Sequence, residues 1–166
     1  MPLPPDRWPL LLVAVLLLLV IAVWLLLRAR RDQFPYELKP VLTDPERHFH
    51  TTLRQALPPG TLLLMKVRLA DFLEITVRND AYLRHFGRIS QKHTDFLVVD
   101  AETLTPLLAI ELDDSSHRHS LRTRESDTFK ELAYQAAGLP LLRVPLARKY
   151  DRSRLREVIQ QGLRSE

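Results

Sequence analysis

The residues best suited to chemistry lie in the segment AIELDDSSHRH, residues 109–119. It begins as an apolar, strand-like run and continues into three acids, two serines and two histidines within eleven residues. Acids and imidazoles this close together can hold a metal ion or transfer protons. The same composition also suits a plain turn, or the remnant of an active site. The choice depends on the elements that position these side chains.

Two apolar segments are predicted to form a hairpin that brings a further acid into the group. Residues 94–100 (TDFLVVD) and 106–113 (PLLAIELD) have the pattern of buried strands, and the short turn between them predicts antiparallel pairing. This pairing places Asp95 opposite residue 111 or 113. Glu111 and Asp113 are two residues apart and share a face of their strand. We therefore expect three carboxylates to meet at one end of the hairpin.

Asp95, Glu111 and Asp113 are predicted to form a metal site. Charged carboxylates in an apolar strand are costly unless something compensates them, and a divalent cation is the simplest compensation. Oxygen ligands on a rigid sheet favour Mg²⁺ or Mn²⁺. The alternative is that the acids lie at a solvated sheet end and only terminate the strand. Three nearby acids are expected to lie in the turn or to point away: Asp100, Glu102 and Asp114.

Two histidines and a lysine follow the acids and could assist them. His117 and His119 could each bind a metal or act as general acid or base, or could be ordinary loop residues. Lys130 lies on the next predicted helix, close to Glu131. It could pair with Asp127 three residues earlier, or it could reach the sheet end and offer its charge to a phosphate.

An acid on the first predicted helix has an ordinary explanation and a functional one. Thr43 and Glu46 have the spacing of a capping box, which stabilises a helix start. His50 lies one turn after Glu46 on the same face, so the pair could also contribute an acid and an imidazole to a site.

The fold class follows from the order of elements after residue 42. Apolar positions four apart predict helices and short apolar runs predict strands, in the order helix, strand, helix, strand, strand, helix, strand, helix. This order predicts an α/β domain with a central mixed sheet of about four strands flanked by helices. With four glycines in the chain, we expect no phosphate-binding loop of the P-loop or Rossmann kind.

The N-terminus carries a candidate membrane anchor. Residues 10–27 are 18 consecutive apolar residues, which is close to the length that spans a bilayer as a helix. A cleaved signal peptide would need positive charge before this run, whereas Arg28, Arg30 and Arg31 follow it. Positive residues stay on the cytoplasmic side. We therefore expect an anchor at 1–31, a tether at 32–42 and a cytoplasmic domain at 43–166.

The basic charge of the chain is mostly a property of this anchor. The chain has a net charge of +4, and residues 1–31 hold four arginines and one aspartate, so the remainder has a net charge of +1. This balance is poor evidence for nucleic-acid binding. The remaining charge is nevertheless uneven: residues 95–114 hold six acids and no Lys or Arg, and residues 143–166 hold seven bases and three acids. An acidic centre beside a basic tail suits a metal-dependent nuclease.

Several segments together resemble a bacterial family, domain of unknown function 2726. They are TDFLVVD, PLLAIELDDSSH and DTFKELAYQAAGLPLLRVP, with LTDPERHFHTTLRQAL and MKVRLADFL upstream. The resemblance covers roughly residues 40–148. This family is grouped with the PD-(D/E)XK nuclease-like superfamily, and the resemblance implies a restriction-endonuclease-like core.

The resemblance also implies roles for particular residues. Asp95 matches the first aspartate of the superfamily motif, a metal ligand, and Glu111 matches the second acid. Asp113 stands where the superfamily has a lysine that positions or activates the attacking water. His117 and Lys130 are the candidates to replace that lysine. Glu46 resembles an acid on the first helix that some members place near the metal.

The sequence thus predicts a nuclease-like domain at the bacterial inner membrane. It would hydrolyse phosphodiesters of nucleic acid with Mg²⁺ or Mn²⁺, using Asp95, Glu111 and Asp113, assisted by His117 or Lys130. The alternative is a non-catalytic module that binds nucleic acid or a protein and has lost the motif lysine. In a third reading the carboxylates are purely structural.

Overall fold

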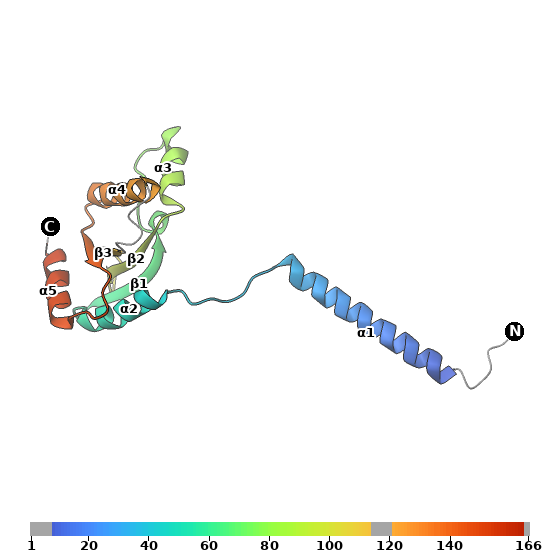
Figure 1. Cartoon of the computed structure of the whole chain (residues 1–166). Helices are drawn as coiled ribbons and strands as arrows, with labels where there is room; N and C mark the ends of the chain where they lie inside the picture. Colours follow the sequence, from blue (N-terminus) through green and yellow to red (C-terminus); the bar gives the residue numbers. More distant parts are fainter. Residues whose placement is uncertain (1–7, 114–120, 165–166) are drawn as a thin grey trace. The chain divides into compact units, whose positions relative to one another are not determined.

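A computed structural model describes residues 8–113 and 121–164, without side-chain detail at 31–33 and 121–127 (Figure 1). The chain divides into two compact units, Met1–Pro40 and Val41–Glu166. The first contains helix α1, Trp8–Gln33. Its stretch Trp8–Arg30 is long and apolar enough to cross a membrane.

The second unit is built on one four-stranded sheet. Its strands are β1 (Thr61–Arg68), β2 (His93–Asp100), β3 (Pro106–Asp113) and β4 (Leu141–Pro145), in spatial order β1-β2-β3-β4. The β1–β2 and β2–β3 pairs are antiparallel and the β3–β4 pair is parallel. A parallel pair needs a long crossover, which helix α4 (Leu121–Ala136) supplies. The predicted mixed α/β sheet is confirmed.

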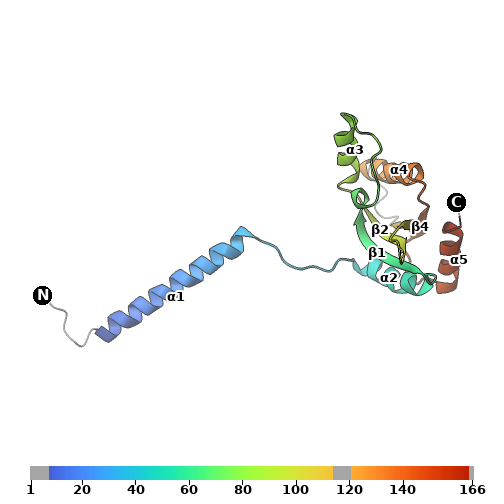
Figure 2. The ribbon, with the colours of Figure 1, turned by 180° about the vertical axis from the view of Figure 1, so that it is seen from behind.

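Helices cover both faces of this sheet (Figures 1 and 2). Helices α2 (Asp44–Ala56) and α5 (Arg152–Gly162) lie on one face. Helices α3 (Ala81–Ile89) and α4 lie on the other, with the short 3-10 helix η2 (Leu69–Asp71). After η2, residues 73–78 have no regular structure.

Alternation along β2 creates the two cores. Phe96 and Val98 join the α2 and α5 side chains in one buried cluster, and Leu97 and Val99 join those of η2, α3 and α4 in the other. Successive strand side chains point to opposite faces, so a continuous apolar run indicates a strand that is covered on both sides. This double cover holds the strand end at Asp95 in place.

Local signals set two of the helix ends. The Thr43 amide donates to the Glu46 carboxylate at 2.8 Å, which confirms the predicted capping box at the start of α2. After α4 the chain turns at Gly138, whose φ of 67° is in the left-handed region that glycine adopts without strain. Gly138 therefore lets the chain turn from α4 toward β4.

Candidate functional site

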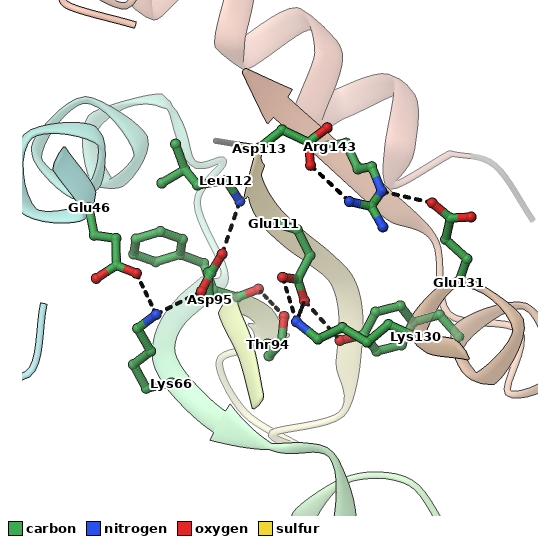
Figure 3. A network of polar contacts seen from close by, with 12 residues as sticks. Glu46, Lys66, Thr94, Asp95, Glu111, Leu112, Asp113, Lys130, Glu131 and Arg143 are labelled. Atoms are coloured by element: carbon green, nitrogen blue, oxygen red, sulfur yellow. Dashed lines mark hydrogen bonds and ion pairs between the residues drawn. The ribbon is translucent and has the colours of Figure 1, made fainter. Parts of the chain in front are cut away.

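Lys66 of β1 binds two carboxylates at one end of the sheet. Its Nζ lies 2.7 Å from Oδ1 of Asp95 and 2.5 Å from Oε1 of Glu46 (Figure 3). All three side chains are less than one third exposed. Burial by itself would lower the pKa of Lys66, but the two carboxylates raise this pKa above its usual value. Lys66 is therefore a permanent positive charge at neutral pH.

The backbone of Lys66 is in an unusual conformation for a strand. Its φ is 54°, in the left-handed region, although its neighbours pair regularly as Met65↔Phe96 and Val67↔Thr94. A non-glycine residue there is strained by roughly 1–2 kcal/mol and must be held by its surroundings. Lys66 was not among the site residues predicted from the sequence. The sequence feature that could have indicated it is a single cation inside the apolar run TLLLMKV, residues 61–67.

Asp95 lies where the described pairing of β2 with β3 begins. That pairing includes Phe96↔Ile110 and Leu97↔Ala109. When this register is continued by one residue, Asp95 lies opposite Glu111. Residue 111 is one of the two positions, 111 and 113, that the sequence predicted opposite Asp95. Oδ2 of Asp95 accepts a hydrogen bond from the Leu112 amide at 3.0 Å. The Asp95 carboxylate thus joins the backbone of β3 to the amine of Lys66 on β1.

Glu111 of β3 is buried beneath α4. Its side chain accepts two hydrogen bonds from Nζ of Lys130, at 2.8 and 2.7 Å, and one from the hydroxyl of Tyr134, at 3.2 Å. Glu111 is 6% exposed and Tyr134 is fully buried. Helix α4 brings the Lys130 amine to the sheet end, and the side chain of Asp127, its alternative predicted partner, lies outside the described residues.

Burial has the largest effect on the pKa of Glu111. It raises the pKa of Glu111 above its usual value; the charge of Lys130 opposes this increase and the charge of Asp95 adds to it. Burial and the neighbouring Glu111 also raise the pKa of the Tyr134 phenol. The influence of Asp95 on Glu111 indicates that the two carboxylates interact electrostatically.

Asp113 has a different partner. Its Oδ1 lies 2.8 Å from a guanidinium nitrogen of Arg143 on β4, and Nε of Arg143 lies 2.8 Å from Glu131 of α4. Arg143 therefore ties two strands to a helix. The three acids predicted to share one metal ion each contact a separate cation: Lys66, Lys130 and Arg143 (Figure 3).

The first helix contributes Glu46 and His50 to the surroundings of Asp95. Burial would raise the pKa of Glu46, but bonds from Lys66 and from Thr43 together lower it. The imidazole of His50 stacks on Phe96, with ring centroids 6.3 Å apart. Glu46 thus has both the predicted cap role and a contact with the candidate site.

Part of the predicted site lies outside the described residues. Asp114, His117 and His119 fall in residues 114–120, and the Asp127 side chain is likewise outside. In the described part of the chain, no three His, Asp or Glu residues form a group that could hold a metal ion. The predicted three-acid cluster is therefore not what the described side chains form: Asp95 and Glu111 are neighbours, and Asp113 is paired with Arg143.

These features define an α/β domain with a polar network at one end of a mixed sheet. The model of a family described as "Protein of unknown function (DUF2726)" matches residues 38–162, so the chain belongs to that family. No curated protein and no solved structure matches the chain.

Proposed function

We propose that residues 41–164 form a nuclease-like domain of the PD-(D/E)XK superfamily that hydrolyses phosphodiester bonds in nucleic acid. One observation carries this proposal. Asp95 and Glu111 lie across from one another on adjacent strands, and each is bound by a lysine amine. Two acids and a lysine at adjoining strands are what the superfamily motif requires. The mixed sheet with helices on both faces also agrees with a restriction-endonuclease-like core.

The donor set fits Mg²⁺ or Mn²⁺ through two carboxylates rather than three. Mg²⁺ keeps several waters and is usually bound by one or two carboxylates together with substrate phosphate. In the described network, the three carboxylates of Glu46, Asp95 and Glu111 face the two ammonium groups of Lys66 and Lys130. This partly buried group therefore has an excess of negative charge that a divalent cation would offset. The bound cation would supply an activated water and charge stabilisation for the phosphoryl group.

The chain's own residues have separable tasks in this proposal. Asp95 and Glu111 would hold the cation, and Lys66 would keep Asp95 ionised and oriented. Lys66 thereby takes the place of the motif lysine whose position Asp113 occupies, a task for which the sequence suggested His117 and Lys130. Lys130 would hold Glu111 and contact a phosphate oxygen. Asp113 and Arg143 would maintain the position of β3 against β4 and α4.

The N-terminal helix supports a location at the bacterial inner membrane. Arg28 and Arg30 end the apolar stretch of α1, and positive residues remain on the cytoplasmic side. The domain would therefore lie in the cytoplasm. Because the chain has no cysteine, a single Thr51→Cys substitution on the exposed side of α2 tests this orientation in spheroplasts. Labelling by a membrane-impermeant maleimide before lysis would contradict a cytoplasmic domain.

A cleavage assay tests the enzymatic proposal. The full chain in a neutral detergent is incubated with Mn²⁺ and with single-stranded DNA, duplex DNA or RNA. We expect cleavage of at least one substrate, lost on addition of EDTA and in the Asp95→Asn plus Glu111→Gln variant. Cleavage by that variant at the rate of the natural chain would show a contaminating enzyme, and no cleavage by the natural chain would overturn the proposal.

The pairing of every predicted ligand with an internal cation favours a second candidate. A domain whose predicted ligands are each bound by a cation could bind nucleic acid, or a protein, without cleaving it. Calorimetry with Mg²⁺ and DNA separates the two candidates. Binding without turnover favours the non-catalytic module, and turnover excludes it.

A further inference from the structure

Helix α3 presents two aromatic rings to solvent. Tyr82 is 42% exposed and Phe86 is 38% exposed. Their rings lie nearly parallel, with an angle of 9° between planes and 6.2 Å between centroids. The buried residue of α3 is Ile89, which packs in the core on the α4 side of the sheet. Both aromatic side chains thus remain more than one third exposed, although α3 packs on the core through Ile89.

Positive charge surrounds these rings. Residues 78–92 hold four Arg and Lys residues, Arg78, Arg84, Arg88 and Lys92, and a single acid, Asp80. This segment is thus strongly basic, although the domain as a whole is nearly neutral. A polyanion would be attracted to this segment, as it would be to the basic residues 143–166.

The basic segment contacts the helix that carries Lys130. The guanidinium of Arg88 lies 4.2 Å from the centre of the Phe129 ring, and the Lys92 amine lies 5.5 Å from it. Phe129 immediately precedes Lys130, whose amine binds Glu111. Lys92 immediately precedes β2, three residues before Asp95. The basic segment and the candidate site are therefore joined through α4 and the start of β2.

From this arrangement we propose that α3 is a binding surface for single-stranded nucleic acid, with bases on Tyr82 and Phe86 and phosphates on Arg84 and Arg88. The proposal rests on the proposed function and names its substrate class. Unpaired bases expose the faces that stack on aromatic rings, whereas the faces of bases in a duplex are covered by their neighbours.

A cavity beside the rings supports an unpaired base as the ligand. It has a volume of about 550 Å³, and Arg78, Tyr82 and Phe86 line it together with Asp71 and Glu74. Asp71 is paired with Arg68. The acids make this cavity unfavourable for a phosphate and leave it suited to a base, whose edge can donate hydrogen bonds.

Fluorescence anisotropy of the full chain in neutral detergent, with EDTA present, tests this surface without cleavage. The probes are fluorescein-labelled 12-mers of DNA and RNA and a blunt duplex of the same DNA sequence. We expect the single strands to bind more tightly than the duplex. The Tyr82→Ala plus Phe86→Ala variant should weaken single-strand binding at least about tenfold, because stacking contributes on that scale for each base. Arg84→Ala plus Arg88→Ala should also reduce the salt dependence of binding.

Matched controls separate this surface from general charge and from exposed rings elsewhere in the chain. Tyr36→Ala removes an exposed ring of the other unit, and Arg154→Ala removes an exposed cation of α5. Both should bind like the natural chain. Circular dichroism and thermal unfolding confirm that each variant is folded.

Single-strand binding that is unchanged in the Tyr82 and Phe86 variant would overturn this inference, even if the natural chain cleaves nucleic acid. Conversely, weakened binding in that variant supports the surface even if no cleavage occurs. Leu83 is 76% exposed, so an anionic lipid surface is the competing ligand. Hydrogen exchange of the chain in nanodiscs decides this point. The inference would also be overturned if anionic lipid protected residues 81–89 and nucleic acid did not. In that case the protection by lipid should be lost in Leu83→Ser.

Discussion

The amine of Lys66 lies 2.7 Å from the carboxylate of Asp95, and the two residues come from neighbouring antiparallel strands. Lys66 adopts a left-handed backbone conformation in the middle of β1, and the same amine reaches Glu46 on α2. The backbone is thus strained at the position where a cation meets Asp95. Strain of this kind concentrates at functional sites.

Replacing Lys66 by methionine should lower the free energy of unfolding by about 1–3 kcal/mol, because Asp95 and Glu46 lose a partly buried ammonium donor. Chemical unfolding of the full chain in detergent measures this change. Arg68→Met is the matched control on the same strand. Its ion pair with Asp71 is about half exposed and screened by solvent, so the expected loss is smaller than that at Lys66. Equal losses in the two variants would argue against a special environment at Lys66.

The free energy of unfolding should depend on pH in opposite ways through Glu46 and through Glu111. The pKa of Glu46 is lowered in the folded chain, so its contribution is present above pH 4.5 and is lost as the pH falls through the folded value. Glu46→Gln should therefore destabilise the chain at neutral pH and have little effect in acid. Unfolding measured from acid to neutral pH gives the comparison, and a constant difference would contradict it.

Glu111→Gln should show the reverse trend. The folded pKa of Glu111 is raised, so the ionised unfolded chain is favoured as the pH rises from 4.5 through the folded value. The stability of the glutamine variant relative to the natural chain should therefore increase from acid to neutral pH. The same unfolding series records it, and a decrease with rising pH would mean that Lys130 outweighs burial.

Tyr134→Phe removes the phenol that donates to Glu111 and should cost about 1 kcal/mol of stability. The pKa of this phenol is raised above its usual 10.0. Near pH 10 the folded natural chain and the phenylalanine variant should therefore give the same tyrosinate absorbance. A larger signal from the natural chain at that pH would show that Tyr134 ionises normally.

Asp113→Asn tests whether this acid is a ligand or a structural partner of Arg143. We expect the Mn²⁺ dissociation constant to change by less than about threefold in this variant, and to rise at least about tenfold in Asp95→Asn. Calorimetric titration of the full chain measures both. A large effect of Asp113→Asn would restore the three-acid site that the sequence predicts.

The sequence predicted the elements of the fold because their signals are local. The apolar runs of β2 and β3, the Thr43 and Glu46 spacing and Gly138 each act within a few residues. The short turn between β2 and β3 likewise predicts their antiparallel pairing, with Asp95 opposite residue 111 or 113. The register of the structure continues to Glu111, and it includes a shift between Val98 and Val99.

What the sequence by itself determined is therefore the mixed sheet, its helical cover, the apolar N-terminal helix and the position of Asp95 opposite residue 111 or 113. Only the tertiary structure decided which cation neutralises each acid. Lys66, Lys130 and Arg143 lie 29, 19 and 30 residues from their carboxylates. Contacts over such separations depend on strand order, helix packing and the turned backbone at Lys66. No local pattern encodes these features, because long side chains of opposite charge can pair in many combinations until the packed core fixes where each chain segment lies.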